Sequence, residues 1–206
     1  MKTQRFNPDW IHDEPNSSTL GLGKLLWELE FHRKRELQMY PPPKMRMLEI
    51  GSYMGESTMM FASTNLFYEI HCVEPFQGEE KYNHWQGYDW EFIENEFKTN
   101  TRFFDNIVLH KDYSYNIIND LEDKSFDFIY IDGNHEQHEV ERDITLCLPK
   151  LKKDGVIAGH DYHKNWPGVM EAVDTLVGKP DWIYRDTSWI KYEIQTAEER
   201  STKPLL

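Results

Sequence analysis

Cysteine is scarce in this chain, and long apolar runs are absent. Two cysteines occur among 206 residues, Cys72 and Cys147, each inside an apolar stretch and without the spacing of a metal site. We expect both to be buried free thiols in a reducing compartment. No apolar segment follows the first residues, and no run is long enough to span a membrane. The composition therefore predicts a soluble cytoplasmic protein with no membrane association.

Basic residues are also few. The chain has 23 Lys and Arg against 36 Asp and Glu, a formal net charge of −13, and no basic stripe. Nucleic acid and anionic membranes are therefore not expected as main partners, although net charge does not exclude a local basic cleft. With 39% apolar and 14% aromatic residues the chain can form a core, and its length suits one domain.

Apolar spacing predicts alternating strands and helices. A leucine-rich helix precedes Pro41, and the turn Lys153–Gly155 precedes the last strand of the alternation. The expected strands are Met45–Ile50, Tyr68–Glu74, Asn106–His110, Phe126–Ile131 and Val156–Gly159, followed by a hairpin of Trp182–Arg185 and Trp189–Ile194. The intervening helices are expected over Thr58–Leu66, around Trp90–Phe97, up to Leu121, over Val140–Leu151 and over Gly168–Val177. We expect an N-terminal arm and helix in 1–43, the main domain in 44–195 and a polar tail in 196–206.

Acids follow the ends of these strands. Four strands end in Glu or in a turn that contains Asp, and Asp112 lies just past the remaining one. The four acids are Glu49, Glu74, Asp132 and Asp161. Because strands that alternate with helices form a parallel sheet, their carboxyl ends meet at one edge, where open α/β folds bind ligands. Turn capping is the alternative reading of these acids.

One of these turns is rich in glycine. Leu48–Ser57 reads as the end of a strand, a turn and the start of a helix. A dinucleotide fingerprint would have glycine two and five residues after Gly51, where this chain has Tyr53 and Glu56. Tyr53, in place of the middle glycine, would obstruct the close approach of a pyrophosphate. Glu49 would repel a phosphate but attract an amino group. The turn therefore favours a ligand without phosphates over NAD or FAD.

Four motifs together resemble a known family. They are Leu48–Ser57, Val73–Pro75, Phe126–His135 and Gly155–Asp161. In this order they are similar to class I S-adenosylmethionine-dependent methyltransferases, and most similar to the small catechol-type O-methyltransferases and their relatives acting on sugars and natural products. The resemblance spans about 45–177. It implies a single Rossmann-like α/β domain with a seven-stranded, mostly parallel sheet of order 3-2-1-4-5-7-6, strand 7 antiparallel, and helices on both faces.

The resemblance assigns S-adenosylmethionine to the turns after the first two strands. Glu49 and the backbone of Gly51, with Tyr53 in the same turn, would receive the methionine amino end. Ser57 would receive the carboxylate near a helix N-terminus, where negative charge is favoured. Glu74 would accept both ribose hydroxyls, since a carboxylate offers two acceptor oxygens.

The adenine ring is expected next to the third strand. By the same resemblance, Asp112 or Ser114 would meet its edge, and Phe76 or Tyr113 would cover its face. Helix capping explains Ser114 equally well, as it does Ser57, and core packing is the alternative for the two aromatic residues.

The same family implies a metal and a base. A catechol-type enzyme holds magnesium through an acid after its fourth strand and a pair after its fifth, which here are Asp132, His160 and Asp161. Asp132 is also expected to contact the cofactor and to act in catalysis. Since magnesium prefers oxygen ligands, His160 weakens the metal site, shifts it towards manganese, iron or zinc, or leaves Asp132 and Asp161 as the only protein ligands. An imidazole hydrogen-bonded within the site is the alternative reading of His160. His135 stands where the family places the base that deprotonates the acceptor; a solvated histidine is the alternative. His163 is a second candidate base.

The predicted function is methyl transfer to a small molecule, most plausibly to an oxygen of a sugar, phenol or natural product. The Asn/Asp-Pro-Pro-Tyr signature of exocyclic amine methylation is absent, which makes nitrogen the lesser option. Aromatic residues outside the motifs would stack on the acceptor: Trp10, Trp85, Tyr88 and Trp166. A homo-oligomer is compatible with the sequence. Two alternatives stay open: a metal-dependent, hydroxylase-like relative on the same fold, and a cofactor-binding module without catalysis.

Overall fold

Strands and helices alternate along the computed structural model, which describes residues 21–78 and 87–192. The strands are β1 (Met45–Ile50), β2 (Phe67–Val73), β3 (Ile107–His110), β4 (Phe126–Ile131), β5 (Leu151–Gly159), β6 (Trp182–Ile183) and β7 (Trp189–Lys191). The helices are α1 (Gly21–Leu37), α2 (Glu56–Ser63), α3 (Trp90–Thr101), α4 (Ser114–Ile117), α5 (Gln137–Cys147) and α6 (Pro167–Leu176), with short 3₁₀ turns η3 (Ile118–Asp120) and η4 (Leu148–Lys150).

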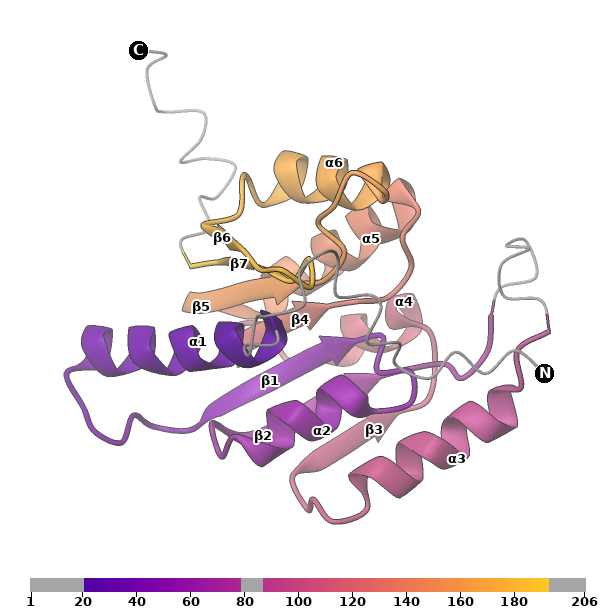
Figure 1. Cartoon of the computed structure of the whole chain (residues 1–206), viewed down its shortest axis with the longest axis horizontal. Helices are drawn as coiled ribbons and strands as arrows, with labels where there is room; N and C mark the ends of the chain where they lie inside the picture. The colour runs from indigo at the N-terminus through magenta and orange to yellow at the C-terminus, as the bar shows by residue number, and fades with distance from the viewer. Residues whose placement is uncertain (1–20, 79–86, 193–206) are drawn as a thin grey trace.

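The strands form one seven-stranded sheet of order β3-β2-β1-β4-β5-β7-β6. The first five strands pair in parallel, and β7 is antiparallel to both of its neighbours. The arrowheads of the parallel strands point to one side of the molecule (Figure 1). The fold expected from the family resemblance is therefore confirmed.

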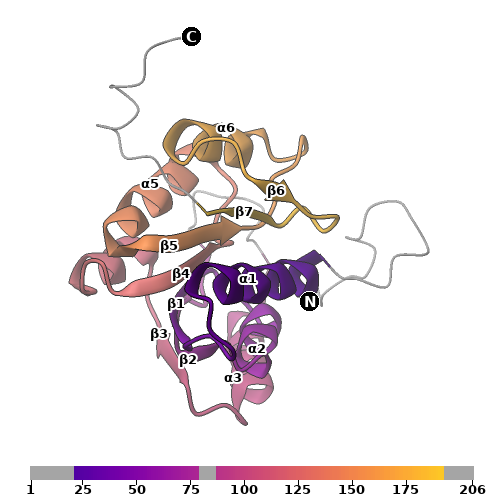
Figure 2. The same ribbon diagram turned by 90° about the vertical axis from the view of Figure 1, so that its left-hand side faces the viewer.

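Helices cover both faces of the sheet, because the central strands are apolar on both sides. On one face α1, α2 and α3 pack through residues such as Leu25, Phe61 and Phe97. On the other face η3, α5 and α6 pack through residues such as Ile144 and Val173. Figure 2 shows α1, α2 and α3 on the opposite side of the sheet from α5 and α6.

The predicted strands Met45–Ile50 and Phe126–Ile131 agree with β1 and β4 to the residue. The expected turn at Lys153–Gly155 is wrong, because β5 already begins at Leu151. The register explains the error: Leu151 lies opposite Phe126 and Val156 opposite Phe128, so five steps along β5 match two along β4. The turn-forming residues bulge out within the strand, as extra residues in a strand do.

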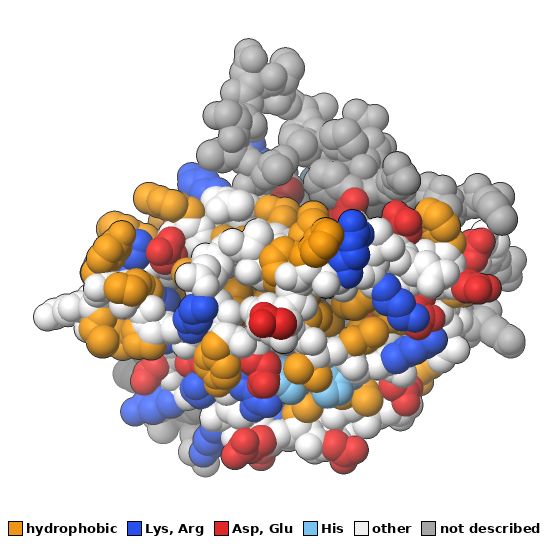
Figure 3. Space-filling model, turned by 90° about the horizontal axis from the view of Figure 1, so that it is seen from below, with side chains coloured by type: hydrophobic (Ala, Val, Ile, Leu, Met, Phe, Trp, Pro, Cys, Tyr) orange, Lys and Arg blue, Asp and Glu red, His pale blue; other side chains and the backbone are white. Residues whose placement is uncertain are grey.

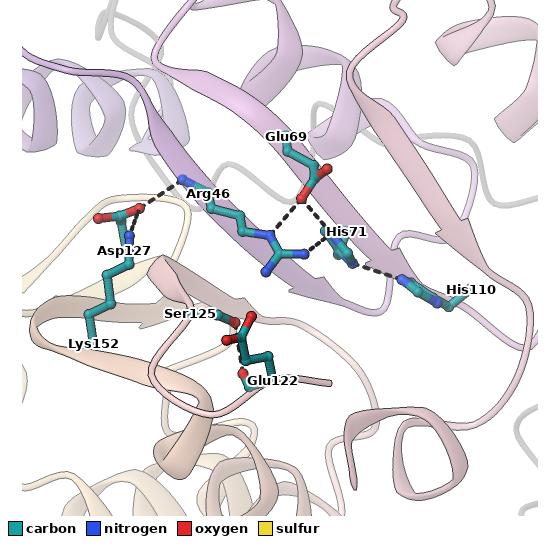
Figure 4. A network of polar contacts seen from close by, with 8 residues as sticks. All are labelled: Arg46, Glu69, His71, His110, Glu122, Ser125, Asp127 and Lys152. Carbon is teal, nitrogen blue, oxygen red and sulfur yellow. Dashed lines mark hydrogen bonds and ion pairs between the residues drawn. The ribbon is translucent and has the colours of Figure 1, made fainter. Parts of the chain in front are cut away.

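A polar network crosses the sheet from β1 to β3 (Figure 4). The Nε of Arg46 donates to Glu69 at 2.5 Å, and the ring of His71 lies 2.9 Å from the same carboxylate. His71 Nδ1 is 2.9 Å from His110 Nε2. Arg46 also lies over the ring of Phe126. The four polar side chains satisfy one another on a part of the sheet where β3 has no fully buried residue.

Several expectations concern membranes, thiols and the chain ends. Neither described segment, 21–78 or 87–192, contains a helix with the length and apolar character needed to cross a bilayer. Cys72 and Cys147 are buried and free, as predicted. Trp10, Trp85 and the boundary between 195 and 196 lie outside the described residues.

Candidate functional site

Backbone hydrogen bonds continue past the ends of the parallel strands and gather the predicted residues at one edge. Gly51 N donates to Val73 O at 3.0 Å, and Asp132 N donates to Ile50 O at 2.8 Å. At the next strand, His160 N donates to Ile131 O at 3.1 Å. These bonds hold the turns after β1, β4 and β5 side by side, as the topology of the sheet requires.

Gly51 lies against the turn after β4. Its φ is +84°, and a Cβ atom at this position would lie 2.1 Å from the carbonyl oxygen of Asp132. Only glycine fits both the left-handed backbone and this close approach. The glycine turn and the turn that carries Asp132 are therefore in direct contact, which joins the expected cofactor half of the site to the expected acceptor half.

Three other residues at this edge have a positive φ although they carry a side chain. They are Tyr53 at 44°, Phe76 at 49° and Asp161 at 59°, which follow β1, β2 and β5. Such conformations cost free energy and tend to concentrate at binding sites. The edge is thus built from turns that fix the direction of specific side chains.

Glu49 lies inside this edge, fully buried beneath α2. Its carboxylate accepts hydrogen bonds from the hydroxyls of Ser52 at 3.0 Å, Ser57 at 2.6 Å and Thr58 at 2.5 Å, and from the Cys72 thiol at 3.4 Å. Burial raises the pKa of Glu49, and these hydroxyl donors oppose the shift. Glu49 therefore fixes the glycine turn to the start of α2, while its contact with a methionine amino group stays a prediction.

Glu74 joins the turns after β1 and β2. Its two carboxylate oxygens accept from the backbone N–H groups of Tyr53 at 2.9 Å and Phe76 at 3.0 Å. Burial raises its pKa, and the two backbone bonds oppose that shift. Each oxygen has a second lone-pair site for a further donor. The hydroxyl of Tyr53 is buried without a hydrogen-bond partner among the described residues.

The residues expected near adenine have partners within the chain. Asp112 accepts from Tyr113 N at 2.7 Å and from the Asn116 side chain at 2.9 Å, and these bonds lower its pKa. The Ser114 hydroxyl donates to Asp143 of α5 at 2.5 Å. The Phe76 ring, 4% exposed, packs against Phe97. Their roles at adenine stay predictions. Tyr113 stacks on Tyr115, 5.3 Å between ring centroids.

Two histidines and two aspartates meet after β4 and β5. His135 Nε2 lies 2.6 Å from Asp161 Oδ2, and His160 Nδ1 lies 3.3 Å from the other oxygen of Asp161. His160 Nδ1 is also 3.8 Å from Asp132. This acid–imidazole cluster contains the expected metal residues and the expected base in one place.

The charges in the acid–imidazole cluster depend on one another. Burial raises the pKa of Asp132 to about 7, with a further rise from Asp161 and an opposing effect of His160. Burial lowers the pKa of His160, but the two aspartates outweigh burial and raise it to about 9. Burial also raises the pKa of Asp161, yet His135 and His160 hold it well below its usual range. His160 is therefore a cation at neutral pH, clamped between carboxylates.

Donor atoms suited to a metal ion occur within this cluster. Ligand atoms of Asp132, His135 and Asp161 all lie within 4.8 Å of one another, whereas the expected set had His160 in place of His135. A protonated imidazole has no lone pair for a metal, so His160 must first lose its proton. The donor chemistry thus fits a divalent metal best at the three residues that include His135.

Trp166 covers one side of the cluster. Its ring stacks on His135 with 4.3 Å between centroids and an angle of 25°, and Trp166 is 42% exposed. Tyr88, another aromatic expected near the acceptor, stacks on Trp90 instead. The Nδ1 of His163, the second candidate base, accepts from Asn165 N at 3.3 Å.

Sequence reasoning missed three residues that hold the site together. Thr58 and Cys72 donate to Glu49, and Asp143 accepts from Ser114. Thr58 sits next to Ser57 at the start of α2, a position from which a contact with the preceding strand could have been inferred. Asp143 is 29 residues from Ser114, and no local spacing indicates that contact.

Comparison with known proteins bears on the same part of the chain. A family model described as a methyltransferase domain matches residues 48–162. An uncharacterized protein of Sinorhizobium fredii, y4gI, is 29% identical over 120 residues, which are 56% of this chain and 13% of that protein. The chain thus spans about an eighth of the length of this relative.

Solved structures share the fold at low sequence identity. Monomeric WbdD is similar over 91% of this chain and 44% of its own, with a TM-score of 0.56 and 13% identity. A protein from Staphylococcus aureus proposed to be a caffeoyl-CoA O-methyltransferase is similar over 82% of this chain and 83% of its own, with a TM-score of 0.53 and 19% identity. These likenesses support the fold assignment.

Proposed function

Because the chain belongs to the methyltransferase-domain family, we propose that this S-adenosylmethionine-dependent methyltransferase acts on an oxygen atom of a small molecule. One observation carries the proposal: the glycine turn touches the turn of Asp132, so that a cofactor held by the first turn ends beside the acid–imidazole cluster. S-Adenosylmethionine supplies a methyl group bound to a positively charged sulfur. The residues of this chain must hold that group in line with the acceptor and remove the acceptor's proton.

The residues after β1 and β2 fit this cofactor. The absence of a Cβ at Gly51 lets the glycine turn lie against Asp132 O, which brings the turns after β1 and β4 together. Glu74 is buried, fixed by two backbone donors and able to accept further hydroxyl groups, as a ribose diol requires. Ser57 stands at the first turn of α2, where a carboxylate is favoured. In this proposal Glu49 acts on the cofactor by keeping Ser52 and Ser57 in place.

The acid–imidazole cluster suits proton transfer. His135 is partly exposed and faces Asp161, a carboxylate that orients the ring and would stabilise the imidazolium formed after proton uptake. General base catalysis of this kind contributes on the order of 10²–10⁴-fold. Alignment of acceptor, methyl carbon and sulfur contributes more in such reactions, since held reactants avoid the entropy cost of meeting. Trp166 gives a flat apolar surface beside the base, suited to a sugar or aromatic ring.

A metal ion would be held by Asp132, His135 and Asp161. One nitrogen and two oxygen donors suit manganese, iron or zinc better than magnesium. A bound divalent ion would lower the pKa of an acceptor hydroxyl. His135 can serve as a metal ligand, or as a base through the ring nitrogen that does not face Asp161, and this choice separates the metal-assisted form of the proposal from the metal-free form.

The experiment is a screen of sugars, phenols and other small hydroxyl compounds with methyl-labelled S-adenosylmethionine, run with EDTA and with added Mn²⁺ or Mg²⁺. Label in an acceptor oxygen supports the proposal, and label in nitrogen acceptors alone contradicts it. Loss of turnover in EDTA that Mn²⁺ restores assigns the ligand role to His135. Turnover unchanged by EDTA assigns it the role of base.

A second function would need His160 to lose its proton and join His135 beside a carboxylate as a metal ligand. Two histidines and one carboxylate with open positions are the donors of non-haem iron oxygenases. The hydroxylase-like alternative therefore predicts oxygen consumption by the Fe²⁺-loaded protein with an organic co-substrate and without S-adenosylmethionine. Binding of S-adenosylhomocysteine without turnover on any compound would instead favour the non-catalytic module.

A further inference from the structure

A large hollow lies away from the acid–imidazole cluster, between α1 and the β6–β7 hairpin. It is a groove of about 810 Å³. We call it the aromatic groove; its lining includes Trp27, Phe31 and Arg35 of α1 and Trp182, Lys191 and Tyr192 of the hairpin. Figures 1 and 2 show α1 next to β7 at the end of the sheet where β6 is the last strand. None of the residues predicted for cofactor, metal or catalysis lines it.

Large apolar side chains around the aromatic groove are exposed. The exposed fractions are 61% for Trp27, 54% for Phe31, 61% for Trp182 and 52% for Ile183. At about 150–250 Å² for a whole aromatic side chain, the three aromatic residues leave on the order of 250–450 Å² uncovered, to which Ile183 adds. A patch of this size is comparable to the largest apolar patch of a typical monomer, and a standard interface buries about 800 Å² on each partner. The four side chains thus supply about half of such an interface.

The charge of this surface differs from the rest of the chain. In α1, Lys and Arg outnumber Glu four to three, and in residues 178–192 Lys and Arg outnumber Asp three to two. The whole chain has 36 acids against 23 bases. The groove lining itself has three acids and two bases, so two copies of this face would bring no large excess of one charge together. Electrostatics therefore allows self-association here.

The shape of the surface also suits a two-fold contact. In such a contact the same patch serves both partners, so it must contain both a hollow and the features that fill it. Here the aromatic groove lies beside Trp27 and Phe31, which stack with 5.7 Å between ring centroids, and beside the exposed Trp182. Arg35 and Lys191 on the one hand and Asp181 on the other place both signs of charge in the same patch.

The surface is held in place before any partner arrives. Tyr184 donates to Glu28 of α1 at 2.6 Å, and Asp186 accepts from the Leu22 backbone N–H at 2.7 Å. Leu25 and Leu29 of α1 are fully buried against the sheet. A preorganised patch loses little conformational entropy on association.

We propose that the aromatic groove is a homodimer interface, in which the exposed rings of each copy enter the groove of the other. Aromatic residues and arginine, which the patch combines, carry most of the binding energy at protein interfaces. The interface does not depend on the identity of the methyl acceptor, and it leaves the acid–imidazole cluster of each copy open.

Sedimentation velocity of the full chain tests the interface. A chain of 24.7 kDa should sediment at twice that mass at micromolar concentration. Trp182→Glu and Phe31→Glu should each raise the dimer dissociation constant at least 30-fold, the effect of losing one central aromatic contact of about 2 kcal/mol. The matched control is Phe103→Glu, which places the same charge at a 78% exposed phenylalanine outside the groove and should leave the dimer intact.

Thermal unfolding of each variant shows whether it is folded. Because there are two independent substitutions, the test still works if one variant does not fold. A wild-type chain that stays monomeric at 100 μM would overturn the proposal. A dimer that survives both substitutions would overturn it as well, because the copies would then meet elsewhere.

Discussion

His135 and Asp161 face each other across 2.6 Å, although 26 positions separate them in the chain. An isolated imidazole would be a weak candidate for a catalytic base, since solvated histidines are common. The carboxylate gives the ring a fixed direction and a partner for its charged form. The pairing of His135 with Asp161 is therefore the most direct place to test the catalytic proposal.

Replacement of His135 by alanine should lower kcat by a factor of about 10²–10⁴, the usual contribution of a general base. The affinity for S-adenosylhomocysteine should not change, because His135 lies with the acceptor half of the site. Kinetics and calorimetry on the same preparation measure both effects. His138→Ala, an exposed histidine three residues along, is the control and should keep full activity. Full turnover in the His135 variant would remove His135 from the mechanism.

Glu74→Gln should weaken S-adenosylhomocysteine binding about 10- to 100-fold, since a hydrogen bond to a charged group contributes about 1.5–3 kcal/mol. The amide keeps the size of the side chain but replaces one acceptor oxygen by a donor. Isothermal titration calorimetry measures the change, with Glu91→Gln on the exposed side of α3 as control. Equal affinity in both variants would show that Glu74 only ties Tyr53 and Phe76 together.

At the scale of single elements, the turn after β1 is the most constrained part of the chain. Gly51→Ala should unfold at clearly lower temperature and lose cofactor binding, because the new Cβ would meet Asp132 O in a left-handed conformation that costs about 1–2 kcal/mol by itself. Gly23→Ala is the opposite case: nothing lies within 4 Å of the new Cβ in α1, so a gain of about 0.5–1 kcal/mol is expected. Urea unfolding measures the stability of both variants. An unaffected Gly51→Ala protein would contradict the described turn.

The network on β1, β2 and β3 should make stability depend on pH. The hydrogen bond with His71 lowers the pKa of Glu69, burial opposes the shift, and Arg46 adds to it. A lowered pKa in the folded state means that the stabilisation is present above the usual value of 4.5 and is lost as the pH falls below it. At pH 7 the free energy of unfolding of the wild type should exceed that of Glu69→Gln by up to about 1 kcal/mol, because the ion pair is partly exposed. The difference should shrink towards pH 3; a constant difference would exclude the ionic contribution.

The elements differ in how far the sequence determines them. β1 and β4 are mostly apolar, each has an acid next to its carboxyl end (Glu49 and Asp132), and both were predicted to the residue. β5 begins five residues before its predicted start because a bulge hides its pairing with β4, and pairing between strands is not a local property. The same limit applies to the candidate site. The ends of the strands predicted which residues gather at one edge of the sheet. The hydroxyl groups around Glu49 and the pairing of His135 with Asp161 could not be predicted, because they depend on how the turns pack in three dimensions.

At the scale of the whole molecule, the fold places cofactor and acceptor residues at one edge of the sheet and the aromatic groove elsewhere. The described side chains seen in Figure 3 mix acidic, basic and hydrophobic types, and no continuous basic stripe crosses that face. The match with the Sinorhizobium fredii relative covers 56% of this chain and 13% of that protein, so the relative is much longer than this chain.

The central claim is that the edge formed by Gly51, Glu74 and Asp132 holds S-adenosylmethionine and not a dinucleotide. The most direct test is a pair of calorimetric titrations of the wild-type chain, one with S-adenosylhomocysteine and one with NAD⁺. The account predicts saturable binding of one S-adenosylhomocysteine per chain and no binding of NAD⁺, because Tyr53 stands where a pyrophosphate would need glycine. Binding of NAD⁺, or no binding of S-adenosylhomocysteine, would contradict it.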